Sequence, residues 1–178
     1  MKDEFEQQNV APVAVSSGSV QAPAVRLRAA APGDDEFLLA VFASTRSEEL
    51  TQLAWDPAQA QAFLKMQFIT QLRNYEAAYP NAENNIVLLG EQAIGRILVD
   101  RSGDEILLVD IAILPEHRNS GIGSALIRDL LREAGEAARP VKLHVFNYSA
   151  ARRLYERLGF SPIGGDEVYL EMRWSIQS

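Results

Sequence analysis

The sequence contains no cysteine, and this absence excludes several kinds of protein. Without thiols the chain has no disulfide framework, no Cys-ligated zinc site and no thiol nucleophile. A chain of 178 residues does not need such supports, because a domain of roughly 150 residues already buries about 68 to 70% of its unfolded surface. The composition therefore predicts one cytoplasmic domain with an ordinary hydrophobic core and no metal.

Positive charge and long apolar runs are also scarce. Seventeen Lys and Arg stand against 24 Asp and Glu, which gives a formal net charge of −7. Such a chain repels phosphate backbones, so a nucleic acid partner is not expected. No stretch approaches the roughly 18 apolar residues of a membrane span, and the N-terminus is too acidic for a secretory signal, so no membrane partner is expected.

The first 24 residues are small and polar, with no run of large apolar side chains to bury. They are expected to form a flexible tail, and the alternative is an extra ordered strand around residues 10–15. Residues 25–178 are expected to form the domain.

From Val25 onward, apolar runs alternate with turn residues. Helices are expected after Pro32-Gly33-Asp34-Asp35, from Asp56-Pro57 to Pro80, over 121–139 and after Ser149. Strands are expected over 25–30, 86–89, 93–99, 105–114, 141–146, 160–163 and 168–174. The segment 105–114 is apolar on both faces except at Asp110, which is typical of a central strand. This order predicts an α/β (α+β) fold, with helices on both faces of a mixed sheet.

A loop with an unusual pair of glycines joins the expected central strand to the next helix. Gly121 and Gly123, separated by one residue, let the backbone approach a ligand, and the amides at the helix start attract a phosphate. The segment matches neither a Walker loop nor a dinucleotide-binding fingerprint. A helix start that needs small residues for close packing is the structural alternative.

Two motifs resemble those of the GNAT N-acetyltransferase superfamily. Residues 118–123 match its acetyl-CoA motif of Arg or Gln, two variable residues, Gly, one variable residue, then Gly or Ala. Residues 147–150 and 154–160 resemble its second motif, Asn-x-x-Ala followed by Leu-Tyr and Gly-Phe. Asn119 and Ser120 depart from the common pattern, in which a glycine and a basic residue are frequent.

The resemblance implies a mostly antiparallel sheet of six to seven strands, split between the central strand and strand 141–146. It also implies acetyl-CoA as co-substrate. The pantetheine arm is expected to pair with the backbone of Ile111, Ala112 and Ile113, next to Asn147, Ala150 and Tyr155. The diphosphate is expected to lie over Arg118, Asn119, Ser120, Gly121, Ile122, Gly123 and Ser124.

Two side chains are candidates for proton transfer. By resemblance, Tyr155 protonates the departing thiolate, although its apolar helix stripe also suits a core aromatic. Asn147 likewise has an alternative role, as a residue that satisfies a turn. Asp110 is the leading general base, because a carboxylate among apolar neighbours has a raised pKa unless it is hydrogen-bonded, and a satisfied structural aspartate is the alternative.

The resemblance implies an N-acetyltransferase that moves an acetyl group from acetyl-CoA to a primary amine of a small molecule, amino acid or peptide. The two N-terminal helices, with Glu48 and Glu49, and the closing hairpin are expected to select the acceptor. A homodimer is allowed by the same resemblance. The alternatives are a non-catalytic acyl-CoA-binding module and a nucleotide-phosphate binder.

Overall fold

Seven strands form one sheet in the computed structural model of the chain, which describes residues 25–46 and 55–176. Across the sheet the strand order is β1-β2-β3-β4-β5-β7-β6. The strands are β1 Val25–Ala29, β2 Glu83–Leu89, β3 Gln92–Asp100, β4 Ile106–Ile113, β5 Val141–Phe146, β6 Ser161–Gly165 and β7 Tyr169–Trp174. The α-helices are α1 Asp35–Ser44, α3 Pro57–Ala78, α4 Ile122–Glu136 and α5 Ala151–Arg157, with short 3₁₀ turns at Pro32–Asp34 and Pro115–His117.

The predicted fold class and order of elements are confirmed. All neighbouring strands run antiparallel except β4 and β5, which are parallel. Strand β2 begins at Glu83, earlier than expected, because its first polar residues still pair with the end of β3. The expected tail 1–24 and the residues Glu48 and Glu49 lie outside the described residues, so these expectations stay predictions.

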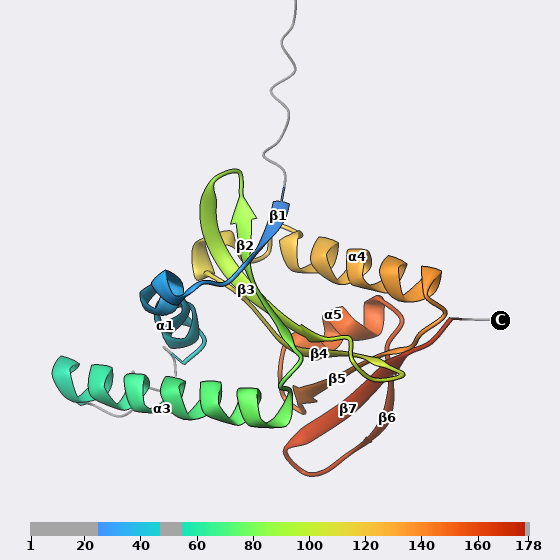
Figure 1. The fold of residues 1–178 in the computed structure, drawn as a ribbon. Helices are drawn as coiled ribbons and strands as arrows, with labels where there is room; N and C mark the ends of the chain where they lie inside the picture. The colour runs from blue at the N-terminus through green and yellow to red at the C-terminus, as the bar shows by residue number, and fades with distance from the viewer. Residues whose placement is uncertain (1–24, 47–54, 177–178) are drawn as a thin grey trace, which may run out of the picture.

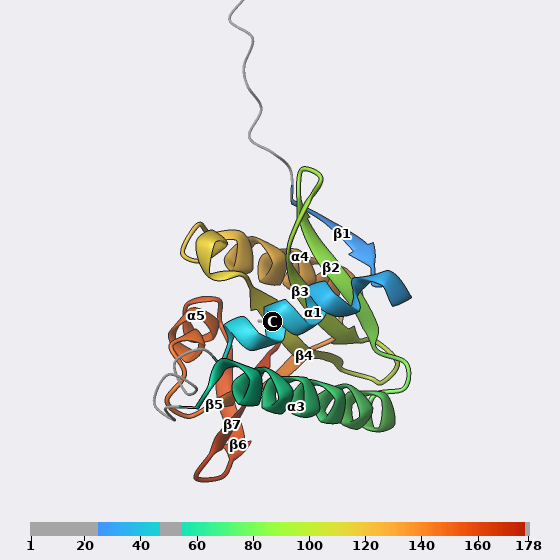
Figure 2. The same ribbon diagram turned by 90° about the vertical axis from the view of Figure 1, so that its left-hand side faces the viewer.

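Helices cover both faces of the sheet (Figure 1). Helices α1 and α3 cross one face, as Figure 2 shows, and α4 and α5 cover the other. Helix α3 begins where the Asp56 carboxylate accepts hydrogen bonds from the N–H groups of Ala58 (2.8 Å) and Gln59 (3.0 Å). Such a cap stabilises a helix by about 1 kcal/mol. Pro57 occupies the first turn, where its missing N–H costs nothing.

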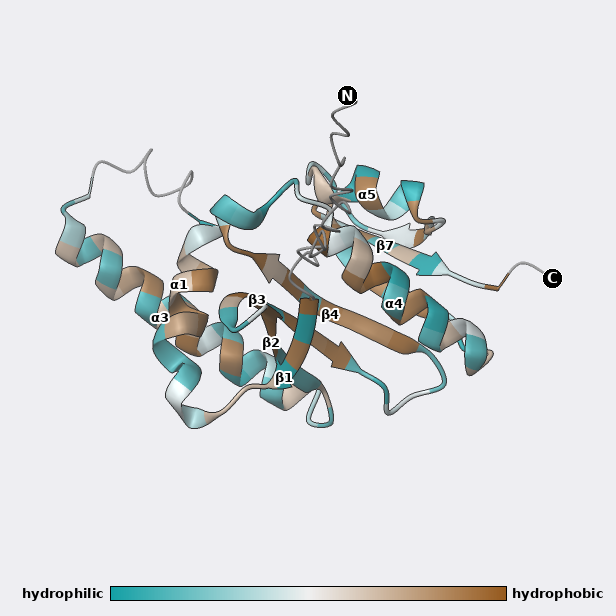
Figure 3. Ribbon diagram, turned by 90° about the horizontal axis from the view of Figure 1, so that it is seen from above, coloured by the Kyte–Doolittle hydropathy of each residue, from teal (hydrophilic) through white to brown (hydrophobic). Residues whose placement is uncertain are grey.

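Two hydrophobic clusters hold these layers together, and the apolar residues concentrate on the central strands and on one stripe of α4 (Figure 3). The larger cluster joins α4 to the sheet, and its helix residues are Ile122, Leu126, Ile127, Leu130, Leu131 and Ala134. The smaller cluster lies under α1 and α3 and consists of Leu38, Phe42, Phe68 and Ile86. The sheet is thus buried on both faces around β3 and β4, which explains their apolar sequences.

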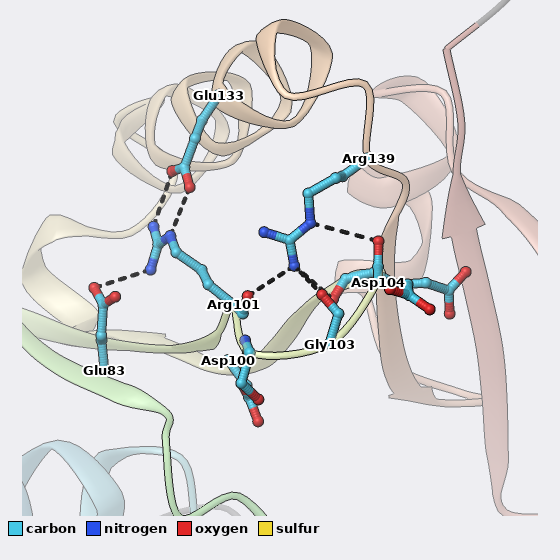
Figure 4. Close-up of polar contacts among 9 residues, drawn as sticks. Glu83, Asp100, Arg101, Gly103, Asp104, Glu133 and Arg139 are labelled. Carbon is cyan, nitrogen blue, oxygen red and sulfur yellow. Dashed lines mark hydrogen bonds and ion pairs between the residues drawn. The ribbon is translucent and has the colours of Figure 1, made fainter.

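Two arginines fasten the β3–β4 turn to the end of α4 (Figure 4). Arg101 bonds both carboxylate oxygens of Glu133, at 2.6 and 2.9 Å, and also contacts Glu83 at 3.0 Å. The guanidinium of Arg139 donates to the carbonyl oxygens of Arg101, Gly103, Asp104 and Glu105. These contacts lie at the end of the sheet where β4 and β5 are paired, and they fix that end.

Candidate active site

The sheet is split between its two parallel strands. β4 and β5 share only the pairs Ile106↔Val141, Leu107↔Lys142 and Leu108↔Leu143. On its other edge, β4 shifts register against β3 between the pairs Val99↔Leu108 and Leu98↔Asp110, so Val109 is an extra, bulged residue. A bulge bends its strand. The rest of β4 therefore runs without β5 as a partner.

The split leaves backbone groups of β4 that do not pair with β5. The Leu114 N–H bonds back to the Ile94 carbonyl at 2.8 Å, on the β3 side. Because backbone groups alternate along an antiparallel strand, the N–H and C=O groups of Ile111 and Ile113 point to the open side. Those of Ala112 point toward β3. Of the three residues expected to pair with the pantetheine arm, Ile111 and Ile113 thus present their backbone groups to the split.

A cavity of about 730 Å³ opens at this split. It extends from β4 across the start of α4 to α5. Among the residues expected to bind the co-substrate, the cavity is lined by Ile111, Ala112, Ile113, Arg118, Asn119, Gly121, Ile122, Gly123, Ser124, Ala150 and Tyr155. The other lining residues were not among those expected to bind the co-substrate, although some lie within the second motif; they are Thr45, His117, Ile127, Ser149, Ala151, Leu154 and Arg157. The structure thus brings two separate sequence motifs into one cavity.

The start of α4 is suited to hold an anion. Gly121 has φ of 85°, a left-handed conformation that favours glycine, and no side chain from the described part of the chain caps the helix. A Cβ atom at either Gly121 or Gly123 would meet no atom of residues 25–46 or 55–176 within 4 Å, so the space before both glycines is open to these residues. The first amides of a helix have no intrahelical acceptor, and the helix dipole adds partial positive charge. These residues fit a diphosphate.

The Arg118 side chain, besides lining the cavity, joins two elements of the fold. Its Nε donates to the Ile113 carbonyl at 2.7 Å, and its Nη2 lies 3.2 Å from both the carbonyl and the hydroxyl oxygen of Ser44. It therefore ties the end of α1 to the end of β4. Arg157 of α5 is an exposed cation that lines the cavity. It follows Tyr155 by two residues, and this proximity to the motif was the available signal.

Tyr155 is both a core aromatic and a residue of the cavity, which were the two alternatives that the sequence left open. Its side chain belongs to the larger hydrophobic cluster, with 7% exposure and a ring centroid 5.7 Å from that of Phe160. It also lines the cavity. Burial, with a smaller contribution from the negative charge of Asp110, raises the pKa of Tyr155 to about 12. The phenol therefore keeps its proton at neutral pH and can donate it.

Asp110 lies on the opposite face of the sheet, beneath α1 and α3. Its carboxylate Oδ2 is 3.4 Å from Nη2 of Arg96, a residue that sequence reasoning did not single out. Burial raises the pKa of Asp110, while the charge of Arg96 and a hydrogen bond from the Ile111 amide oppose the shift. The expected direction of the pKa shift is confirmed. A carboxyl with a raised pKa can accept a proton in a poorly solvated site.

Two residues that were expected to bind the co-substrate, Asn147 and Ser120, do not line the cavity. The Asn147 amide donates to the Asp166 carbonyl at 2.9 Å, which is the turn role that the sequence left open. The Ser120 hydroxyl donates to the His117 carbonyl at 2.5 Å. His117, in contrast, lines the cavity, and its buried Nε2 has no hydrogen-bond partner within residues 25–46 and 55–176.

Metal and membrane sites were also sought among the described residues. In these ranges no three His, Cys, Asp or Glu side chains come together in a way that could hold a metal ion. No helix there combines the length and the apolar character that a membrane span requires.

Comparison with known proteins relates this geometry to one family. Residues 81–162 match the family model described as "Acetyltransferase (GNAT) domain". A PaiA N-acetyltransferase from Thermoplasma acidophilum, solved with coenzyme A, superposes with a TM-score of 0.65 at 16% identity, over 86% of this chain and 99% of that one.

A second solved structure covers a similar share. It is described as a histone acetyltransferase HPA2 and related acetyltransferase from Corynebacterium glutamicum. It superposes with a TM-score of 0.60 at 24% identity, over 86% of this chain and 96% of that one. At these identities the likeness concerns the fold alone.

Proposed function

The chain carries an acetyltransferase domain of the GNAT superfamily, and from this premise we propose that it transfers an acetyl group from acetyl-CoA to a primary amine. The acceptor is the amine of a small molecule, an amino acid or a peptide. The observation that carries this proposal is the single cavity that connects the glycine pair of α4, the open edge of β4 and Tyr155. A long ligand with an anionic end and a polar, amide-bearing arm suits these three parts in that order. The cytoplasmic location and a homodimer stay predictions.

The residues along the cavity divide the binding of acetyl-CoA between them. The amides at the start of α4 would hold the diphosphate, and Arg157 would add a positive charge nearby. The Ile111 carbonyl and the Ile113 N–H, which point to the open side of β4, would pair with the pantetheine arm, because the Ile113 carbonyl is held by Arg118 and the Ile111 amide bonds Asp110. When bound, acetyl-CoA supplies the thioester. An N–H of this β4 edge aimed at the thioester oxygen would bind more strongly as negative charge develops there.

Asp110 would act as the proton acceptor on one side of the sheet, and Tyr155 would act as the proton donor on the other. Asp110 accepts a proton from the acceptor ammonium, which leaves a neutral amine with a free electron pair. The amine nitrogen then bonds to the carbonyl carbon as the carbon–sulfur bond breaks. Tyr155 donates its proton to the departing thiolate, and it can do so because its pKa of about 12 keeps the phenol protonated. The nitrogen, positively charged once it has bonded to carbon, loses its second proton to water to give the neutral amide, and the tyrosinate takes a proton back from water.

The test is the release of free CoA thiol from acetyl-CoA with a panel of amines. The protein has no cysteine, so every thiol that the assay detects comes from CoA. Turnover with at least one amine supports the transferase. Tight binding of acetyl-CoA in calorimetry, with no thiol released by any amine, would instead support a non-catalytic acyl-CoA-binding module. Equal affinity for ATP and CoA would support a nucleotide-phosphate binder.

A further inference from the structure

A second cavity lies on the face of the sheet that carries Asp110, between the C-terminal half of α3 and strands β2 and β3. Its volume is about 320 Å³, and its wall includes Tyr75, Glu76, Asn84 and Arg96. Figure 2 shows α3 crossing this face. Asn84 pairs with Leu98 on β3, and Asp110 pairs with the same Leu98 from β4. The cavity therefore lies one strand away from the candidate base.

Arg96 is a buried cation whose hydrogen bonds are incomplete. Its relative exposure is 2%, yet neither Nε nor Nη2 has a hydrogen-bond partner among the described residues. The Asp110 carboxylate lies 3.4 Å from its Nη2, and the centroid of the Tyr75 ring lies 5.6 Å from its guanidinium carbon. Unpaired buried N–H groups on a charged side chain are costly, so a site that keeps them suits a ligand that pairs with them.

The Nε and Nη2 groups of Arg96 suit one class of ligand. Nε and Nη2 lie side by side on the planar guanidinium, and their parallel N–H groups match the two oxygens of a carboxylate. Asn84 lines the same cavity, and its buried Oδ1 has no hydrogen-bond partner within the described ranges, so it could accept an N–H or O–H of the ligand. Glu76 is exposed, and solvent screens its charge at the cavity wall.

The position of Arg96 relative to Asp110 sets the distance between two groups on one ligand. Arg96 is paired with Ala112 on β4, two residues along from Asp110 and on the same face. Adjacent strands lie about 4.8 Å apart. A carboxylate on Arg96 and an amine at Asp110 would thus be separated by a few bonds, as in an α- or β-amino acid.

We propose that the acceptor is an amine that carries a carboxylate close to the reacting nitrogen, and that Arg96 binds this carboxylate in the cavity beneath α3. The inference rests on the proposed function, because it names the acceptor class of the same transferase. It adds a selection step to the site: the acceptor is held by its acid group while Asp110 receives the proton of its amine.

The experiment compares amino acids with the amines left by their decarboxylation, namely leucine with isopentylamine, phenylalanine with phenethylamine, and β-alanine with ethylamine. Thiol release gives kcat/KM for each. A charge-assisted bidentate pair is worth roughly ten- to hundredfold in binding, so the wild-type protein is expected to prefer at least one amino acid over its amine by about that factor. Equal efficiency within every pair would overturn the inference and leave the transferase assignment intact.

Matched variants keep Arg96 in place and avoid the loss of a buried charge. Asn84→Asp puts a carboxylate beside Arg96 inside the cavity, where it should compete with the ligand and raise KM for the amino acid roughly tenfold. Asn85→Asp makes the same change of charge one residue along, on the other face of the sheet, where Asn85 lines a different cavity. Its KM should stay within about twofold of wild type. An unchanged preference in Asn84→Asp would overturn the inference.

A binding readout separates this inference from the proposed function. If no amine releases thiol, the transferase proposal fails, and the cavity is tested by NMR on the Nε–H resonance of Arg96, assigned with Arg96→Lys. A shift of that resonance on addition of leucine or β-alanine, and none with the decarboxylated amines, supports the carboxylate site. No shift with any of them refutes it.

Discussion

Gly95 lies on β3 opposite Ile113, in the half of β4 that does not pair with β5. Its replacement by alanine should push β4 out of position and so disturb the candidate active site. A Cβ at this position would lie 2.4 Å from the Ala112 carbonyl oxygen and 3.1 Å from the Ile113 Cα. Both obstacles are backbone atoms, so a side-chain rotation cannot relieve the clash. Restoring ordinary contact requires β4 to move by about 1 Å, and overpacking of this kind costs roughly 1 to 3 kcal/mol.

The expected effects of Gly95→Ala follow from that displacement. For a chain of this size, each kcal/mol lowers Tm by about 2 to 4 °C, so a calorimetric Tm should fall by roughly 2 to 12 °C. Ala112 and Ile113 line the cavity, and a displacement of about 1 Å at a reacting centre can cost roughly a hundredfold in rate. We therefore expect kcat/KM for acetyl-CoA to fall by ten- to a hundredfold.

The control is Gly33→Ala. Gly33 is exposed, and a Cβ there would meet no atom of the residues that the structure describes within 4 Å. Its Tm should change by about 1 °C or less, and its kinetics should match those of the wild type. A Gly95→Ala protein that keeps both the wild-type Tm and the wild-type KM for acetyl-CoA would refute the argument that β4 is held in place by contact with this glycine.

Three further changes test the proposed roles of individual residues. Tyr155→Phe should lower kcat tenfold or more and change KM for acetyl-CoA little, and an unchanged kcat would remove the phenol from proton transfer. Asp110 accepts a proton only when it is ionised, and burial raises its pKa above 3.8, so wild-type activity should decline as the pH falls through that raised pKa. Asp110→Asn should be slow and should lack this acid limb in a profile of kcat/KM from about pH 4 to 9; a profile of unchanged shape would point to another base. Gly121→Val forces a β-branched residue to φ of 85° and fills the space before the helix, so saturation with acetyl-CoA should require a much higher concentration, and an unchanged KM would show that the anion lies elsewhere.

The order of elements could be predicted from the sequence because each element leaves a local signal. Apolar alternation marks the strands, and Asp56 before Pro57 marks the start of α3. The glycine pair marks the start of α4, and the two motifs lie together in the structure as the resemblance implied. Each of these signals comes from residues that are close together in the sequence, so a single sequence is enough to reveal them.

The contacts between strands could not be predicted in the same way. The bulge at Val109 changes the pairing of β4 with β3 and decides which residues face Asp110. Arg96 is the one charged residue of an otherwise apolar strand segment, a signal available in the sequence, but only the register places it beside Asp110. The direction of the Arg118 side chain is likewise fixed by Ser44, a residue far away in the chain.

The short pairing between β4 and β5 has a mechanical consequence. Strands β5 and β7 share six residue pairs, whereas β4 and β5 share three. The sheet therefore consists of two parts, β1 to β4 and β5 to β6, which are joined along only half the length of β5. Acetyl-CoA bound between the separated halves of β4 and β5 would supply hydrogen bonds that the two strands do not make to each other. Binding of acetyl-CoA should then slow amide hydrogen exchange in β5 and β7 together with β4, because the bound donor would connect the two parts of the sheet.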